Sequence, residues 1–220
     1  MIILDPGHGG TDAGAVANGV KEKDWALEVS LYQYNRLKQL GIPSRLTRSK
    51  DVTLSPKERS SFVKKSGADI CISNHFNAGG GEGVETIHSL FSPATLAKQC
   101  LEAIHQAGQP MRRAYSRKGS NGYDYYFMHR DTGKVETIIV EYGFLDNAFD
   151  FARLKNKEYR LSLAEAVVQV LARHYPQSHT PQKKIDSKIY TVQIGAFQQK
   201  TNAEKLVKEL KVKGYDAFIK

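Results

Sequence analysis

The hydrophobic pattern of this chain alternates between short apolar runs and longer stretches with helical spacing. Apolar runs at residues 2–4, 68–73 and 137–140 are bounded by polar or turn residues, which is typical of buried strands. Apolar residues recur every three or four positions over residues 24–40 and 161–174, which predicts helices there. Strands and helices that alternate in this way predict an α/β three-layer sandwich, with a largely parallel mixed sheet and helices on both faces.

The same pattern gives further elements between these segments. It predicts strands at residues 44–48, 84–91 and 125–129, and helices that begin near Ser55 and Ser92. Residues 109–124 are rich in arginine and tyrosine but show no clear periodicity. We therefore expect that segment to be a surface loop over the crevice at the edge of the sheet.

A change in composition divides the chain into two parts. Residues 177–188 are polar and contain proline, which predicts a linker after a first domain at residues 1–176. Residues 189–220 then show a strand, a helix and the start of a second strand, a partial β-α-β unit. A unit of that size is too small to bury a core without help.

Composition and charge narrow the class of protein. The 220 residues are 40% hydrophobic and 25% charged, as in ordinary globular proteins, and no apolar run approaches the roughly 20 residues of a membrane span. The formal net charge is +9, and nine lysines face four acidic residues from Gln177 onward. This basic tail suits a polyanionic partner. The two cysteines are expected to be inert core thiols. The first strand begins at once, so we expect either a protein made without a secretion signal or one whose signal has been cut away.

Side chains that could bind a metal or transfer a proton follow directly after three of the apolar runs. His8 follows the first run, His75 the second and Glu141 the third. Ligands of open α/β sheets collect at the carboxyl ends of the strands, so these side chains are expected at one edge. Two histidines and a glutamate suit a metal site with an acid/base partner. The spacing leaves the third ligand open among the acidic residues Asp5, Asp12, Glu22, Asp24, Glu82 and Glu141.

Other interpretations of these residues are weaker or purely structural. His8 could be a turn histidine bonded to backbone carbonyls, and His75 could pack under a loop. His129 is an outside candidate for the crevice, because it ends a predicted strand. A phosphate-binding loop after Gly10 is disfavoured, because no helix begins directly there.

Several motifs together resemble one known family, the zinc-dependent N-acetylmuramoyl-L-alanine amidases of type 3. The motifs are ILDPGHGG at residues 3–10, DAG at 12–14, EKD at 22–24, LTR at 46–48, SNHFNA at 73–78 and VEYGFLDN at 140–147. The resemblance extends over about residues 1–175. It implies an α/β fold, a zinc ion held by His8, Glu22 and His75, and Glu141 as the catalytic base. The bond it implies is the amide between the lactyl group of N-acetylmuramic acid and L-alanine of the stem peptide.

The tail has a resemblance of its own. YTVQIGAF at residues 190–197, with the helical residues after it, is similar to the first half of a SPOR peptidoglycan-binding repeat. We thus expect peptidoglycan, and anionic cell-wall polymers, as partners of a monomer that binds no nucleic acid and no membrane. It would be a phage endolysin or a sporulation autolysin, made in the cytoplasm and reaching the wall after lysis or release. The alternatives are a zinc peptidase that trims stem peptides and an inactive wall-binding module.

Overall fold

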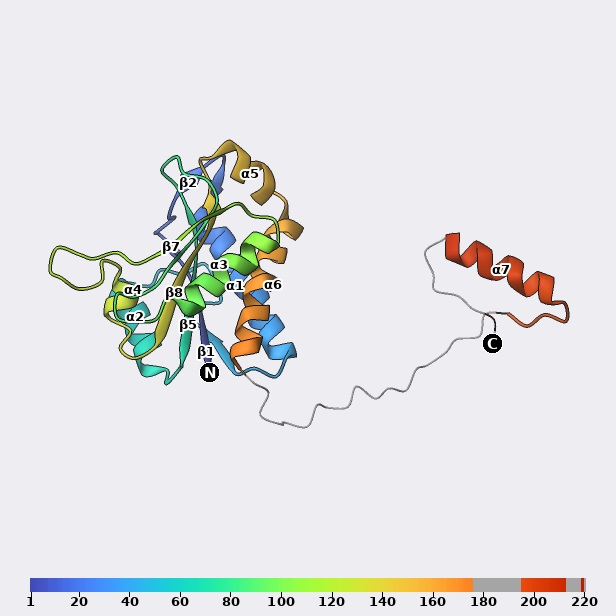
Figure 1. Cartoon of the computed structure of the whole chain (residues 1–220), viewed down its shortest axis with the longest axis horizontal. Coiled ribbons are helices and arrows are strands. Elements are labelled where there is room, and N and C mark those ends of the chain that lie inside the picture. Colours follow the sequence, from blue (N-terminus) through green and yellow to red (C-terminus); the bar gives the residue numbers. More distant parts are fainter. Residues whose placement is uncertain (176–194, 213–218, 220) are drawn as a thin grey trace. The chain divides into compact units, whose positions relative to one another are not determined.

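The computed structural model describes residues 1–175, 195–212 and 219 (Figure 1). The chain divides into two compact units, Met1–Gln177 and Ser178–Lys220. The predicted linker at 177–188 and the predicted strand at 190–194 lie outside the described residues. The predicted helix of the tail is present as α7 (Lys200–Val212).

The first unit is built on a six-stranded sheet with the order β4-β1-β5-β8-β6-β7. Its strands are β1 (Ile2–Pro6), β4 (Ser44–Leu46), β5 (Ile70–Asn77), β6 (Val84–Ile87), β7 (Met111–Tyr115) and β8 (Glu136–Phe144). The first four strands in that order are parallel, whereas β6 pairs with β8 in the antiparallel sense and with β7 in the parallel sense. The carboxyl ends of β1, β5 and β8 therefore share one edge, which we call the C-terminal edge.

Helices cover both faces of the sheet, as Figure 1 shows. The larger core lies beneath α1 (Glu22–Gln39), α3 (Thr95–Gln106) and α6 (Lys157–His174). The smaller core, around Ile3, Val63 and Met128, lies beneath α2 (Pro56–Lys65) and α4 (Phe127–Arg130). This arrangement confirms the α/β sandwich with a mixed, mostly parallel sheet.

Local sequence explains where helix α2 begins. The side chain of Ser55 accepts a hydrogen bond from the backbone of Glu58, and the carboxylate of Glu58 accepts one from the backbone of Ser55. Pro56 occupies the first turn, where its missing N–H costs nothing. Helix α2 therefore begins where the sequence predicts.

Two predicted elements differ in the structure, and one element was missed. Residues 111–115 form the edge strand β7, which pairs only with β6, so its largely exposed side chains carry no alternating signal. Residues 127–130 are helical, although the aromatic residues there favoured a strand. The sequence analysis missed α5 (Ala148–Leu154), whose cap Asn147 accepts from the backbone of Phe149 and Asp150.

The two cysteines are free and buried, which confirms the expectation of core thiols. Cys71 lies in the smaller core and Cys100 in the larger one. Burial raises the pKa of both thiols, that of Cys100 to about 12. Among the helices that the structure describes, none combines the length and the apolar character that crossing a membrane requires.

Candidate metal centre

Three predicted side chains converge at the C-terminal edge of the sheet. His8 lies just beyond β1, Glu22 is the first residue of α1, and His75 belongs to β5. Each offers one ligand atom, and these atoms all lie within 4.8 Å of one another. Residues 67 positions apart in the sequence thus form a single cluster of two imidazoles and one carboxylate.

The carboxylate of Glu22 lies between the two imidazole rings. Its Oε1 is 2.8 Å from Nδ1 of His75, and its Oε2 is 3.1 Å from Nε2 of His8. Backbone N–H groups of Ala15 and Phe76 also donate to this carboxylate. Burial would raise the pKa of Glu22, but the hydrogen bonds with the histidines outweigh it and hold that pKa well below its usual range. The centre therefore keeps a negative charge that a cation would neutralise.

Asp12 contacts the centre from outside. Its Oδ2 lies 2.9 Å from Nδ1 of His8, which leaves Nε2 of that ring directed to the centre. A carboxylate in this position orients a metal-binding imidazole and raises its basicity. Asp12, one of the open alternatives for the third ligand, is instead a partner of a histidine.

Two arginines hold the turn that carries His8. Arg59 donates to the carbonyls of Pro6 and His8 at 2.6 Å each, and Arg48 donates to the carbonyls of Pro6 and Gly7. These bonds fix a turn in which His8 itself adopts a φ of +57°, a conformation that costs an ordinary residue about 1 kcal/mol or more. Arg48 belongs to the LTR motif at residues 46–48 and Arg59 follows Glu58, but the sequence analysis assigned neither arginine a role in this turn.

The other acidic candidates have separate roles. Asp5 is fully buried and pairs with Arg59 at 2.6 Å, so it stabilises the fold rather than joining the cluster. Asp24 is exposed on α1, and Glu82 pairs with Arg153 at 3.4 Å. Glu22 is thus the one acidic candidate that the structure places between the two histidines.

Two glycines leave the space in which the cluster fits. A Cβ on Gly7 would lie 2.3 Å from the ring of His75, and one on Gly14 would lie 2.5 Å from Glu22 Oε2. We call Gly7 and Gly14 the glycine cradle. Two imidazole nitrogens and one carboxylate are a ligand set that zinc prefers, with a further position left for water. The chemistry and the crowding of these residues therefore fit a zinc ion.

Glu141 lies beside this cluster in β8. It is the register partner of His75 in β5 and of Glu85 in β6. Within the described part of the chain, its buried Oε2 has no hydrogen-bond partner. Burial and the charges of Glu22 and Glu85 raise the pKa of Glu141 well above its usual range. A carboxylate with an uncommitted oxygen and a raised proton affinity suits general acid/base chemistry.

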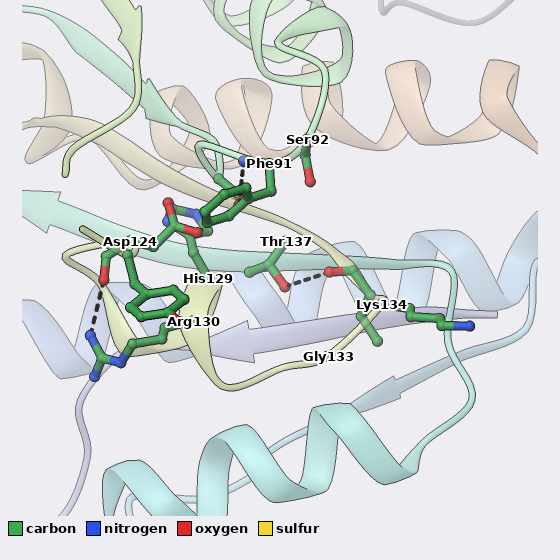
Figure 2. Close-up of a pocket in the computed structure, with 11 residues that line it drawn as sticks. Phe91, Ser92, Asp124, His129, Arg130, Gly133, Lys134 and Thr137 are labelled. Carbon is green, nitrogen blue, oxygen red and sulfur yellow. Dashed lines mark hydrogen bonds between the residues drawn. The ribbon is translucent and has the colours of Figure 1, made fainter. Parts of the chain in front are cut away.

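His129, which was an outside candidate from sequence, is not part of the cluster of His8, Glu22 and His75. It lies on α4 and lines a hollow of about 470 Å³ with Phe91, Asp124 and Thr137, all shown in Figure 2. Thr137 precedes Glu141 by four residues, roughly 13 Å along the strand, so this hollow lies toward the opposite edge of the sheet. Burial lowers the pKa of His129 to about 4.

The segment 109–124 is also placed differently from the prediction. Its first part forms β7, and residues 117–121 line a second hollow with Asp124 and Arg130, which also line the first hollow. The C-terminal part of the segment therefore does not cover the crevice. The reason is that β6 and β7 run opposite to β8, so the chain after β7 emerges at the other edge of the sheet.

Comparison with known proteins gives one consistent result. The family model described as N-acetylmuramoyl-L-alanine amidase matches residues 2–173, and the SPOR domain model matches residues 186–220. The chain is 33% identical to the N-acetylmuramoyl-L-alanine amidase CwlM of Bacillus licheniformis, over 99% of this chain and 83% of that protein. It is 30% identical to the sporulation-specific amidase of Bacillus subtilis, with the same coverage of both chains.

Among solved structures, one similar fold is the catalytic domain of the amidase CwlV from Bacillus (Paenibacillus) polymyxa. The TM-score is 0.71 at 26% identity, over 79% of this chain and 96% of that domain. The similarity thus covers the unit that holds the cluster of His8, Glu22 and His75.

Proposed function

This chain belongs to the N-acetylmuramoyl-L-alanine amidase family and hydrolyses peptidoglycan, and we propose that His8, Glu22 and His75 hold its zinc ion while Glu141 is its base. One observation carries the proposal. The ligand atoms of the first three residues lie within 4.8 Å of one another, and Glu141 is the register partner of His75 with one oxygen uncommitted.

The bond to be cleaved is the amide between the lactyl group of N-acetylmuramic acid and L-alanine. When bound, zinc lowers the pKa of water toward about 7 and polarises a carbonyl oxygen. Glu141 takes a proton from the attacking water and delivers it to the nitrogen of the departing L-alanine. His8 is held in one orientation by Asp12, and Glu22 is held by two backbone N–H groups, so the ligands need little rearrangement during turnover.

The tail supplies a second contact with the wall. The SPOR match at residues 186–220 supports peptidoglycan binding by this unit, and α7 carries lysines at 200, 205, 208 and 211. Those positive charges suit anionic polymers of the wall. We propose that the tail holds the enzyme near its substrate, which raises the local concentration of scissile bonds.

The test combines metal analysis with product analysis. The full chain is expected to bind one zinc ion and to release whole stem peptides with a free L-alanine amine, detected by mass spectrometry of digested muropeptides. A chelator should stop the reaction. Glu141→Gln should keep zinc and lose activity by at least about 100-fold. Glu136→Gln is the matched control, because it makes the same change at the other end of β8.

Three results would contradict the proposal. Release of single terminal amino acids would show a peptidase instead of an amidase. Cleavage by zinc-free protein would remove the metal from the mechanism. Full activity of Glu141→Gln would remove that residue from its role.

A further inference from the structure

Two arginines of the edge strand β7 contact Glu85, which lies opposite Glu141 in the sheet. Arg112 and Arg113 each donate from Nε to Oε1 of Glu85, at 2.7 and 2.8 Å. Glu85 is buried and is the register partner of Glu141 across β6 and β8. The pair of guanidiniums is therefore tied to the strand that borders the proposed site.

The guanidinium groups are also held by aromatic rings. Arg112 lies 5.2 Å from the ring centroid of Phe144, and Arg113 lies 4.2 Å from that of Tyr115. Their side chains remain 40% and 55% exposed. Each arginine donates from Nε to Glu85 and places one face of its guanidinium against an aromatic ring. Its terminal nitrogens have no hydrogen-bond partner among residues that the structure describes. The donors are thus fixed in place and open to a ligand.

Glu85 is the carboxylate that both guanidiniums contact. One carboxylate faces two guanidiniums, and the second oxygen of Glu85 already accepts a hydrogen bond from Asn77 at 3.0 Å. Both guanidiniums contact this one carboxylate, and their exposed ends present positive charge at the surface. A guanidinium with free terminal N–H groups binds carboxylates with two parallel hydrogen bonds.

The chemistry of the substrate indicates which part carries the matching charge. N-acetylmuramic acid has a single carboxyl group, that of the lactyl ether. In a muropeptide this group is part of the scissile amide and carries no charge. Negative charge in a muropeptide therefore lies on the peptide. We propose that Arg112 and Arg113, anchored by Glu85, form a subsite that binds a carboxylate of the stem peptide and selects acidic over amidated peptides. This inference rests on the proposed function and specifies how it chooses substrates.

The test uses two muropeptides that differ at one group of the peptide, a carboxylate in one and a carboxamide in the other. The full chain should cleave the carboxylate form with a kcat/KM about tenfold higher, the value of one charged hydrogen-bonded contact. In Arg112→Gln/Arg113→Gln this ratio should fall to near one. Arg117→Gln is the matched control: it removes the same charge from a guanidinium that stacks on Tyr125 at 3.7 Å, beside the second hollow.

The ratio is measured on one preparation, so a partly unfolded variant does not alter it. Equal cleavage of both substrates by the unmodified chain, or a ratio that persists in the double variant, would overturn the subsite. Calorimetry of the same two muropeptides binding to Glu141→Gln distinguishes a wrong subsite from a wrong proposed reaction. If neither ligand is cleaved by the unmodified chain but the carboxylate form still binds about tenfold more tightly, the subsite stands and the proposed reaction does not.

Discussion

Replacing Gly7 by alanine tests whether the glycine cradle sets the position of a zinc ligand. Gly7 does not have a positive φ, so alanine introduces no backbone strain and the effect is steric. The added Cβ would lie 2.3, 2.5 and 2.6 Å from three atoms of the His75 ring, where ordinary contact begins at 3.4 Å. The ring must therefore move by about 1 Å.

That displacement is large on the scale of metal coordination. Zinc–nitrogen distances are about 2.0–2.1 Å and tolerate changes of about 0.2 Å. A shift several times larger removes His75 from the ligand set. Changes that only disturb the partners of ligands already weaken metal binding by 10–100-fold, so we expect a loss of at least about 100-fold for Gly7→Ala.

The assay is a competition for zinc between metal-free protein and a chromogenic chelator, which needs no substrate. Gly119→Ala is the control, because Gly119 also lacks a positive φ and its nearest neighbour would be 3.1 Å from the new Cβ. The control should bind zinc like the unmodified chain. A zinc affinity of Gly7→Ala within twofold of the unmodified value would refute the assignment of His75 as a ligand at this distance.

Three further changes probe the fold that supports the site. Arg59→Met should cost about 3–5 kcal/mol in urea unfolding, because it leaves Asp5 buried without its cation; a loss below 1 kcal/mol would contradict this. Asn147→Ala should cost about 1 kcal/mol by removing the cap of α5, and an unchanged stability would show that the cap is dispensable. His129→Gln should weaken the pH dependence of the free energy of unfolding of the metal-free protein between pH 6.5 and 4. Burial depresses the pKa of His129 to about 4, so on acidification the unfolded chain takes up this proton before the folded chain does. The free energy of unfolding of the unmodified chain should therefore fall as the pH falls, by up to about 3 kcal/mol from this group. An equal dependence of unfolding free energy on pH in the variant and the unmodified chain would refute this.

The sequence was informative where a short apolar run ends in a functional residue. Such runs place His8, His75 and Glu141 toward the carboxyl ends of neighbouring parallel strands, which is a local signal combined with one rule of sheet topology. Glu22 could not be chosen from spacing, because its position depends on the hairpin of β2 (Val16–Ala17) and β3 (Val20–Lys21), which directs the start of α1 into the crevice. Its assignment came from the family resemblance.

The elements that the sequence misplaced depend on neighbours that are distant along the chain. The exposed strand β7 is defined by pairing with β6, and α4 is defined by packing of Met128 against the smaller core. The structural roles of Arg48 and Arg59 were missed for the same reason, since their partners are backbone carbonyls of another segment. Local propensity does not encode such contacts.

The two thiols also determine which surroundings this molecule tolerates. Neither sulfur is accessible, and burial keeps both in the protonated form that reacts slowly with oxidants and alkylating reagents. The catalytic unit reaches its final shape without any oxidation step, because its cohesion comes from two apolar cores and from buried ion pairs. Its covalent structure is therefore the same under reducing and oxidising conditions, and the protein can be purified with or without a reductant.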